Sequence, residues 1–159
     1  MMTKATKITT VIIGIVFVCF IGRCAYMILC ISCTTAPIKT YDYTGTMDQF
    51  DKKIKQFASA NSGVNLTISS RDNTIKRSAR DITIKIKGNP NVRYDLVLYD
   101  FNGATKLDLE GIYDETHKTG GINMKDKDVE KLYAGFKADL LPRLSKSQGI
   151  VLKADWFNF

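Results

Sequence analysis

The fold is decided by the segment Asp81–Leu98, DITIKIKGNPNVRYDLVL. Apolar and polar residues alternate on both sides of Gly88–Asn91, and a period of two is typical of β-strands that bury one face. Gly, Asn and Pro together favour a tight turn between two such runs. The segment therefore predicts an antiparallel hairpin with one apolar face and one polar face.

The same alternation continues on both sides of this hairpin. Residues 64–69 (VNLTIS) predict a strand before it, and residues 106–110 (KLDLE) predict a strand after it. Asn102-Gly103 is the dipeptide typical of a two-residue hairpin turn, which requires φ > 0 at both positions. Four consecutive strands with short links predict an antiparallel meander.

Two amphipathic helices flank the predicted meander. The first begins at the capping box Thr46–Gln49, in which the Thr46 hydroxyl and the Gln49 amide satisfy each other's backbone N–H groups. Its apolar stripe consists of Met47, Phe50, Ile54, Phe57 and Ala58. The second begins at Asp126 or Asp128, and we expect Pro142 to end or kink it. Its stripe consists of Val129, Leu132, Tyr133, Phe136 and Leu140.

Two such helices can both be buried only against the apolar face of the sheet. The sequence therefore predicts an α+β fold, a two-layer sandwich with an antiparallel four-stranded meander and two helices on one face. Residues 150–159 would add a short fifth strand or an extended tail. We place the exported domain at residues 46–159, a linker at 34–45 and an N-terminal membrane segment at 1–33.

The first 33 residues have the character of an export signal. Lys4 and Lys7 precede an apolar run that Arg23 interrupts and that then continues to Cys33. Three hypotheses remain open: an uncleaved transmembrane helix, a lipoprotein signal peptide, or an ordinary signal peptide that is removed. In each of them the positive end stays in the cytoplasm and residues 34–159 lie outside it.

The end of this run, Cys30-Ile31-Ser32-Cys33, resembles the bacterial lipobox, with Cys30 where Leu is usual. In this respect the chain is similar to small bacterial envelope lipoproteins. The resemblance implies lipid attachment at Cys33, a membrane-anchored location in the periplasm or at the cell surface, and a role in assembly, transport or immunity.

Composition limits the chemistry of the exported domain. Apolar residues make up 45% and charged residues 25% of the 159 residues, which is a globular balance. All four cysteines lie within residues 1–33, so no disulfide can stabilise the domain. His117 is the only histidine, which excludes a catalytic triad and a site with several histidines. We therefore predict no catalytic residue, metal site or cofactor, and do not expect an enzyme.

One stretch concentrates positive charge. Residues 71–93 hold seven basic residues against two acidic ones. This candidate anion-binding or partner-binding cluster consists of Arg71, Lys76, Arg77, Arg80, Lys85, Lys87 and Arg93. Another envelope protein or an anionic surface is the expected partner. Nucleic acid is not, because export removes the domain from it.

These observations favour a membrane-anchored envelope protein with a non-enzymatic domain that binds a macromolecular partner in an accessory or assembly role. Two alternatives remain. The domain would be an immunity-type inhibitor of a toxin or foreign enzyme, or it would be a small-ligand-binding or hydrolytic domain. The last alternative requires a deep apolar pocket between the sheet and the helices.

Overall fold

The computed structural model describes residues 23, 36–71 and 78–155. The chain forms two compact units, residues 1–35 and 36–159, and the fold presented below is that of the second unit. The predicted membrane segment, including Cys33, lies outside the described residues apart from Arg23. Within the described part of the chain, no helix is both long and apolar enough to cross a bilayer.

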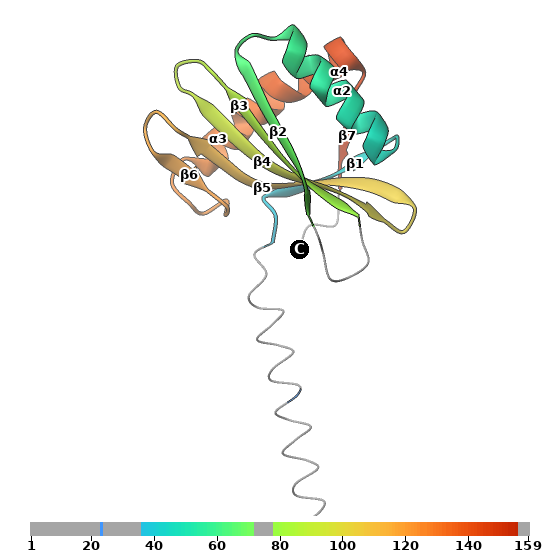
Figure 1. Ribbon diagram of the computed structural model, residues 1–159. Coiled ribbons are helices and arrows are strands. Elements are labelled where there is room, and N and C mark those ends of the chain that lie inside the picture. The colour runs from blue at the N-terminus through green and yellow to red at the C-terminus, as the bar shows by residue number, and fades with distance from the viewer. Residues whose placement is uncertain (1–22, 24–35, 72–77, 156–159) are drawn as a thin grey trace, which may run out of the picture. The chain divides into compact units, whose positions relative to one another are not determined.

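The second unit is an α+β domain built on a seven-stranded antiparallel sheet (Figure 1). The strand order is β2-β3-β4-β5-β1-β7, and β6 pairs with β5. The strands are β1 Lys39–Tyr43, β2 Val64–Arg71, β3 Ala79–Ile86, β4 Val92–Phe101, β5 Ala104–Asp114, β6 Thr119–Gly121 and β7 Leu152–Ala154. The predicted strand count of four or five is therefore too low.

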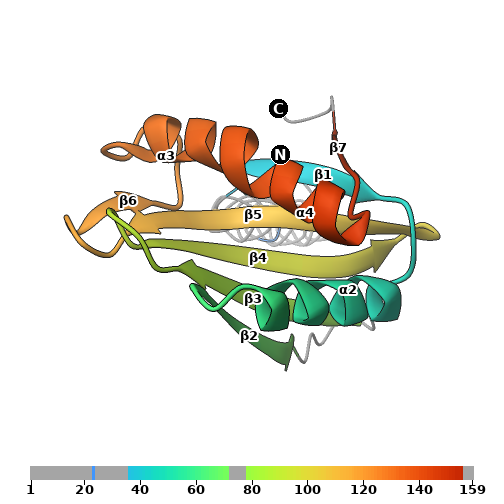
Figure 2. The ribbon, with the colours of Figure 1, turned by 90° about the horizontal axis from the view of Figure 1, so that it is seen from above.

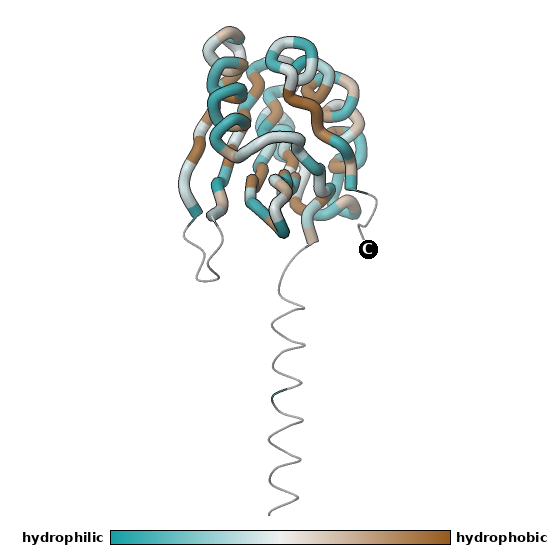
Figure 3. The backbone as a smooth tube through the Cα atoms, turned by 90° about the vertical axis from the view of Figure 1, so that its right-hand side faces the viewer, coloured by the Kyte–Doolittle hydropathy of each residue, from teal (hydrophilic) through white to brown (hydrophobic). Residues whose placement is uncertain are grey.

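The helices lie over one face of this sheet, as expected for a two-layer arrangement (Figure 2). Hydrophobic and hydrophilic residues follow one another in short bands along the backbone of the domain (Figure 3). The helical elements are α2 Met47–Ala60, α3 Val129–Gly135, the π-helical turn η1 Phe136–Leu140, and α4 Leu141–Gln148.

The four predicted strands of the meander are confirmed as β2 to β5. Asn102 and Gly103 link β4 to β5 with φ values of 52° and 80°, the left-handed conformation that this hairpin turn requires. The remaining strands add to this meander at its β5 side. Two of them, β6 and β7, have three residues each, and β7 lies within residues 150–159, where we expected a short fifth strand or an extended tail.

Strand β1 is the main difference from the predicted architecture. Its residues belong to the segment 34–45, which we expected to be a linker, but they pair with β5 on one side and β7 on the other. Tyr41 and Tyr43 are 2% and 5% exposed and belong to the core. Their spacing of two residues places both side chains on the face that the helices cover.

Both predicted apolar stripes lie in the core. Phe50, Phe57 and Phe136 are 0–1% exposed and are among the largest fully buried side chains. The predicted capping box is also present, because Gln49 N–H donates to Thr46 Oγ1 and Thr46 N–H donates to Gln49 Oε1. These contacts confirm the start and the inward face of α2.

The second helical region passes Pro142 through a π turn. Leu141 N–H donates to the carbonyl of Phe136, five residues earlier. Because proline has no N–H and its ring crowds the preceding turn, this wider turn lets the helix continue without a break. The helix then ends at Gly149, whose φ of 60° provides a left-handed C-cap.

Phe136 provides a direct test of this core. Its ring lies 5.1 Å from Tyr94 and 6.0 Å from Tyr41, so Phe136→Ala would leave a cavity between the helix and two strands. We expect the free energy of unfolding to fall by about 3–5 kcal/mol in a urea titration. Lys131→Ala on the exposed side of α3 should change it by less than about 0.5 kcal/mol. A loss of under about 1 kcal/mol for Phe136→Ala would contradict the assigned core.

Candidate functional site

The predicted basic cluster is divided between the two faces of the sheet. Arg80 lies on the face that the helices cover, where its guanidinium contacts the first turns of α2. Arg71, Lys85 and Arg93 make their ion pairs with residues of the opposite face, here called the outer face. Lys76 and Arg77 lie outside the described residues. The structure therefore does not gather the described members of the cluster into one patch.

One ion-pair network on the outer face centres on Arg71. Its Nε lies 2.9 Å from Asp81 Oδ1, and its two terminal nitrogens lie 3.2 and 3.3 Å from the two carboxylate oxygens of Glu110. Paired donation of this kind is the strongest arrangement of an arginine with a carboxylate. The positive charge of Arg71 is therefore compensated by two acids from other strands.

Lys85 and Arg93 share a second acid. Glu115 Oε1 lies 2.7 Å from Lys85 Nζ and 3.6 Å from Arg93 Nη1, and Asp95 lies 3.3 Å from Arg93 Nε. The Arg93 guanidinium also stacks over the Tyr113 ring at 4.1 Å. Of the cluster members that the structure describes, Lys87 is the one without an ion pair. Most of the positive charge counted along the sequence is therefore paired within the domain.

Asp108 is a half-buried acid of the outer face. Thr40 Oγ1 donates a hydrogen bond of 2.6 Å to it from β1, and the Tyr99 hydroxyl donates a second from β4. Burial raises the pKa of Asp108, and although these two hydrogen bonds act in the opposite direction, its pKa stays above the ordinary value. Asp108 therefore carries its negative charge at some cost to stability.

The single histidine takes part in a loop contact. Asp114 accepts hydrogen bonds from the backbone N–H groups of Thr116 and His117 and lies 2.7 Å from His117 Nδ1. This carboxylate closes the turn between β5 and β6. In the described residues, no group of three or more His, Cys, Asp or Glu side chains is arranged to hold a metal ion.

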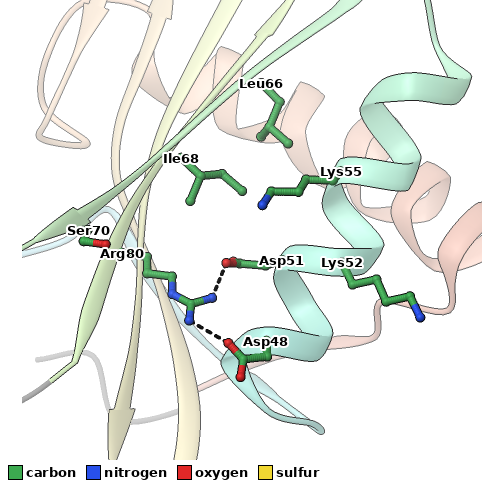
Figure 4. A pocket seen from close by; sticks show the side chains of 8 residues that line it. All are labelled: Asp48, Asp51, Lys52, Lys55, Leu66, Ile68, Ser70 and Arg80. Atoms are coloured by element: carbon green, nitrogen blue, oxygen red, sulfur yellow. Dashed lines mark hydrogen bonds and ion pairs between the residues drawn. The ribbon is translucent and has the colours of Figure 1, made fainter.

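The candidate functional site is a groove between α2 and β2, here called the α2–β2 groove (Figure 4). It has a volume of about 750 Å³. Helix α2 lines one side, β2 provides an apolar floor, and Arg80 of β3 lies near one end. The lining residues are Asp48, Asp51, Lys52, Lys55, Leu66, Ile68, Ser70 and Arg80.

The charges that line the α2–β2 groove are only partly paired. Arg80 donates to Asp48 at 2.6 Å and forms a second ion pair with Asp51, which ties β3 to the start of α2. Lys55 points into the groove above the apolar floor, whereas Lys52 points away from it (Figure 4). Neither lysine has an ion pair with a described residue. Lys55 is therefore the positive group available to an occupant of the groove.

The floor of this groove is also an edge of the sheet. Strand β2 pairs with β3 on one side, and Lys87 N–H donates to Gly63 O at 2.8 Å beside the first pair of the ladder. Because hydrogen-bonded and non-hydrogen-bonded pairs alternate in an antiparallel ladder, Asn65, Thr67 and Ser69 direct their backbone groups to β3. The backbone N–H and C=O groups of the alternate residues point away from β3, and these residues are Leu66, Ile68 and Ser70.

This outward row has no backbone partner among the residues that the structure describes. Val64 N–H, at the start of β2, donates to Asn61 O, so the open row begins after it. Leu66 and Ile68 are half-buried and pack against the core from this edge. The groove thus combines unpaired backbone groups, an apolar floor and one unpaired cation.

The sequence indicated the apolar face of β2 but not which end of the meander would stay a free edge. That property depends on β1, which joins the sheet beside β5 and so leaves β2 at the other end. The signal that could have found it was the spacing of Tyr41 and Tyr43, which has the period of a strand. No family model matches the chain, and no curated protein or solved structure matches it significantly.

Asp108 leads to a pH-dependent prediction. A carboxyl whose pKa is raised by folding stabilises the fold while it is protonated, and that stability is lost as the pH rises through the raised pKa. Asp108→Asn removes the charge and keeps an oxygen acceptor. We therefore expect a higher Tm than wild type at neutral pH, and a difference that disappears near about pH 3, below the ordinary range of a carboxyl.

The control for this prediction is Asp128→Asn, at an exposed residue whose φ of 64° suits asparagine. This variant should keep the Tm of wild type at neutral pH. Thermal unfolding followed by circular dichroism at several pH values makes the comparison. A lower Tm for Asp108→Asn at neutral pH would show that the charged carboxylate stabilises the outer face.

Proposed function

We propose that this protein is a membrane-anchored envelope protein whose exported domain binds an extended segment of another envelope protein. The partner segment adds as a strand to the free edge of β2 and fills the α2–β2 groove. The observation that supports this proposal most directly is the row of outward backbone groups at Leu66, Ile68 and Ser70 beside that groove.

An extended polypeptide matches this row better than any other ligand class. Donors and acceptors that alternate along a strand edge are satisfied together only by a second strand, which repeats the same spacing. Every other side chain of that strand would then face the groove and cover Leu66 and Ile68. The main-chain bonds would provide affinity, and the groove-facing side chains would provide specificity.

The charge of the groove indicates which side chains of the partner strand would fit it. Lys55 lies above the apolar floor without an anion, so a glutamate is well matched: its methylene groups would pack on the floor and its carboxylate would pair with Lys55. A second copy of the chain is a poorer occupant. Pairing two β2 strands across a twofold axis would bring the exposed Lys52 and Lys55 of both copies near one another.

The small-ligand alternative is less well supported by this geometry. A small-molecule site is mostly apolar and enclosed between structural elements. The α2–β2 groove instead lies along the sheet edge, and five of its eight lining residues are charged. The immunity-type alternative differs from the main proposal in the identity of the bound protein, which a crosslinking experiment would reveal.

Anchoring is the second part of the proposal. Its support is the sequence of residues 1–33, in which a positively charged start is followed by a long apolar run and by the lipobox-like Cys30–Cys33. In the lipoprotein form, Cys33 would carry the lipid. In the uncleaved form, the whole run would span the bilayer. Both forms hold the domain at the membrane surface, outside the cytoplasm.

Site-specific crosslinking in intact cells tests the proposed binding. A photoreactive amino acid at Ser70, in the groove, should give an adduct with a discrete envelope protein, and the same amino acid at Glu130, on α3, should not. Lys55→Glu should reduce the yield of this adduct about tenfold, the effect of losing about 1.4 kcal/mol of binding. Lys52→Glu is the matched control and should leave the yield unchanged.

The two lysine variants distinguish a groove contact from general attraction. They lie on the same helix, are both exposed and change the charge equally, but only Lys55 points into the groove. Equal losses for both variants would mean that the overall charge of the domain governs the contact. An adduct of the same yield from Glu130 would place the partner elsewhere on the domain and contradict the proposal.

A further inference from the structure

We propose that the α2–β2 groove selects a partner strand that runs antiparallel to β2 and carries, in this order, a basic residue, any residue and a glutamate. This inference rests on the proposed binding of a partner strand, and it names the chemistry and the direction of that strand. It goes beyond the match of one glutamate with Lys55, because a second charge at one end of the groove sets the order of the partner's residues.

The register of β2 decides which side chains of a partner enter the groove. Ile68 pairs with the buried core residue Ile82, so its side chain lies on the face that the helices cover. Leu66 and Ser70, two positions away on either side, share this face. The same three residues direct their backbone groups outward. Each of them would pair with one residue of an added strand, and the side chains of those three partner residues would enter the groove.

The end of the groove beside Ser70 is negatively charged. Arg80, which pairs with Ser70 across the ladder, contacts two carboxylates, those of Asp48 and Asp51. Two acids against one guanidinium leave one net negative charge. In the described part of the chain, Oδ1 of Asp51 is buried without a hydrogen-bond partner, so Arg80 compensates these acids only in part.

An occupant of the groove can reach this negative end. The Asp48 side chain is 86% exposed, whereas that of Asp51 is 13% exposed. Ser70 is small and exposed, so a long side chain opposite it can extend across it toward Asp48. Lysine and arginine have such side chains and the charge that this end lacks. A basic residue therefore fits the partner position opposite Ser70.

The middle of the groove carries the opposite charge. Lys55 points toward the part of the floor formed by Leu66 and Ile68 (Figure 4). It follows Asp51 by four residues on α2, so the two groups lie on one side of the helix and about 6 Å apart along its axis. Alternate residues of a strand are about 7 Å apart. The two charges of the groove therefore match partner residues that are two positions apart.

The direction of the added strand decides the order of its charges. Every strand pair of the described sheet is antiparallel, and antiparallel pairing is more stable per residue than parallel pairing. A strand antiparallel to β2 passes Ser70 first, then Ile68 and then Leu66. It would therefore present its basic residue first, its glutamate two positions later, and an apolar residue opposite Leu66.

The same charges disfavour the reverse order. A glutamate opposite Ser70 would face Asp48, and a basic residue opposite Ile68 would face Lys55. Like charges brought together at an interface lower affinity and exclude wrong partners. The groove would thus distinguish two strands of the same composition by the order of their residues alone.

Two synthetic heptapeptides of identical composition test this order. The first is Thr-Lys-Thr-Glu-Thr-Leu-Thr, and the second exchanges its lysine and its glutamate. Threonine fills the other positions because it favours strands. Each peptide carries a fluorescent label, and its binding to the full chain in detergent micelles is followed by anisotropy. We expect the first peptide to bind about tenfold more tightly, since both charge contacts of the second are repulsive.

A charge reversal on α2 locates the discrimination. Lys55→Glu should reduce the ratio of the two affinities to nearly one, because each peptide then has one attractive and one repulsive contact. Lys52→Glu is the matched control and should leave the ratio unchanged, since Lys52 points away from the groove (Figure 4). Far-UV circular dichroism checks that both variants keep their helices. Equal losses for the two variants would overturn the assignment of Lys55.

Amide hydrogen exchange separates this inference from the proposed function. The bound first peptide should slow the exchange of the outward amides of Leu66, Ile68 and Ser70. Equal affinities of the two peptides together with this protection would overturn the charge order and leave strand binding intact. Tighter binding of the second peptide would overturn the antiparallel order. Absence of this protection with both peptides would overturn strand binding at β2 and this inference together.

Discussion

The pairing of β1 with β5 is the interaction on which the rest of this domain depends. Five residue pairs join the two strands, from Lys39 opposite Leu109 to Tyr43 opposite Thr105. This ladder buries Tyr41 and Tyr43 beneath the helices and offers the other side of β1 to β7. The sheet therefore grows beyond the meander only on the β5 side, and β2 remains at the opposite edge. The proposed binding of a partner strand at β2 follows from that asymmetry.

The asymmetry also makes the two ends of the sheet structurally different. At the β1 end, the chain enters the sheet through β1 and leaves it through β7. At the β2 end, the backbone groups of Leu66, Ile68 and Ser70 point away from the ladder and line the α2–β2 groove.

Much of this architecture could be predicted from local patterns, because alternation, capping and turn chemistry are short-range properties. The meander, both buried stripes and the Asn102-Gly103 turn are examples. The features that depend on pairing between distant segments could not be predicted in this way. Pro37 and Gly45 made residues 34–45 resemble a linker, and the strand in it is revealed only by its partner β5, about 65 positions away. The basic cluster failed to form a patch for the same reason, since acids such as Glu110 and Glu115 lie outside the window of positive charge but beside it in the sheet.

Amide hydrogen exchange along β2 tests the central claim, that this strand is a free edge, most directly. In the purified chain without a partner, the amides of Asn65 and Thr67 should be protected because they face β3. Those of Leu66, Ile68 and Ser70 should exchange much faster because they face outward. Alternating protection along the strand is the predicted result. Equal protection of all five amides would show that another segment or another copy already covers the edge, and would contradict the account.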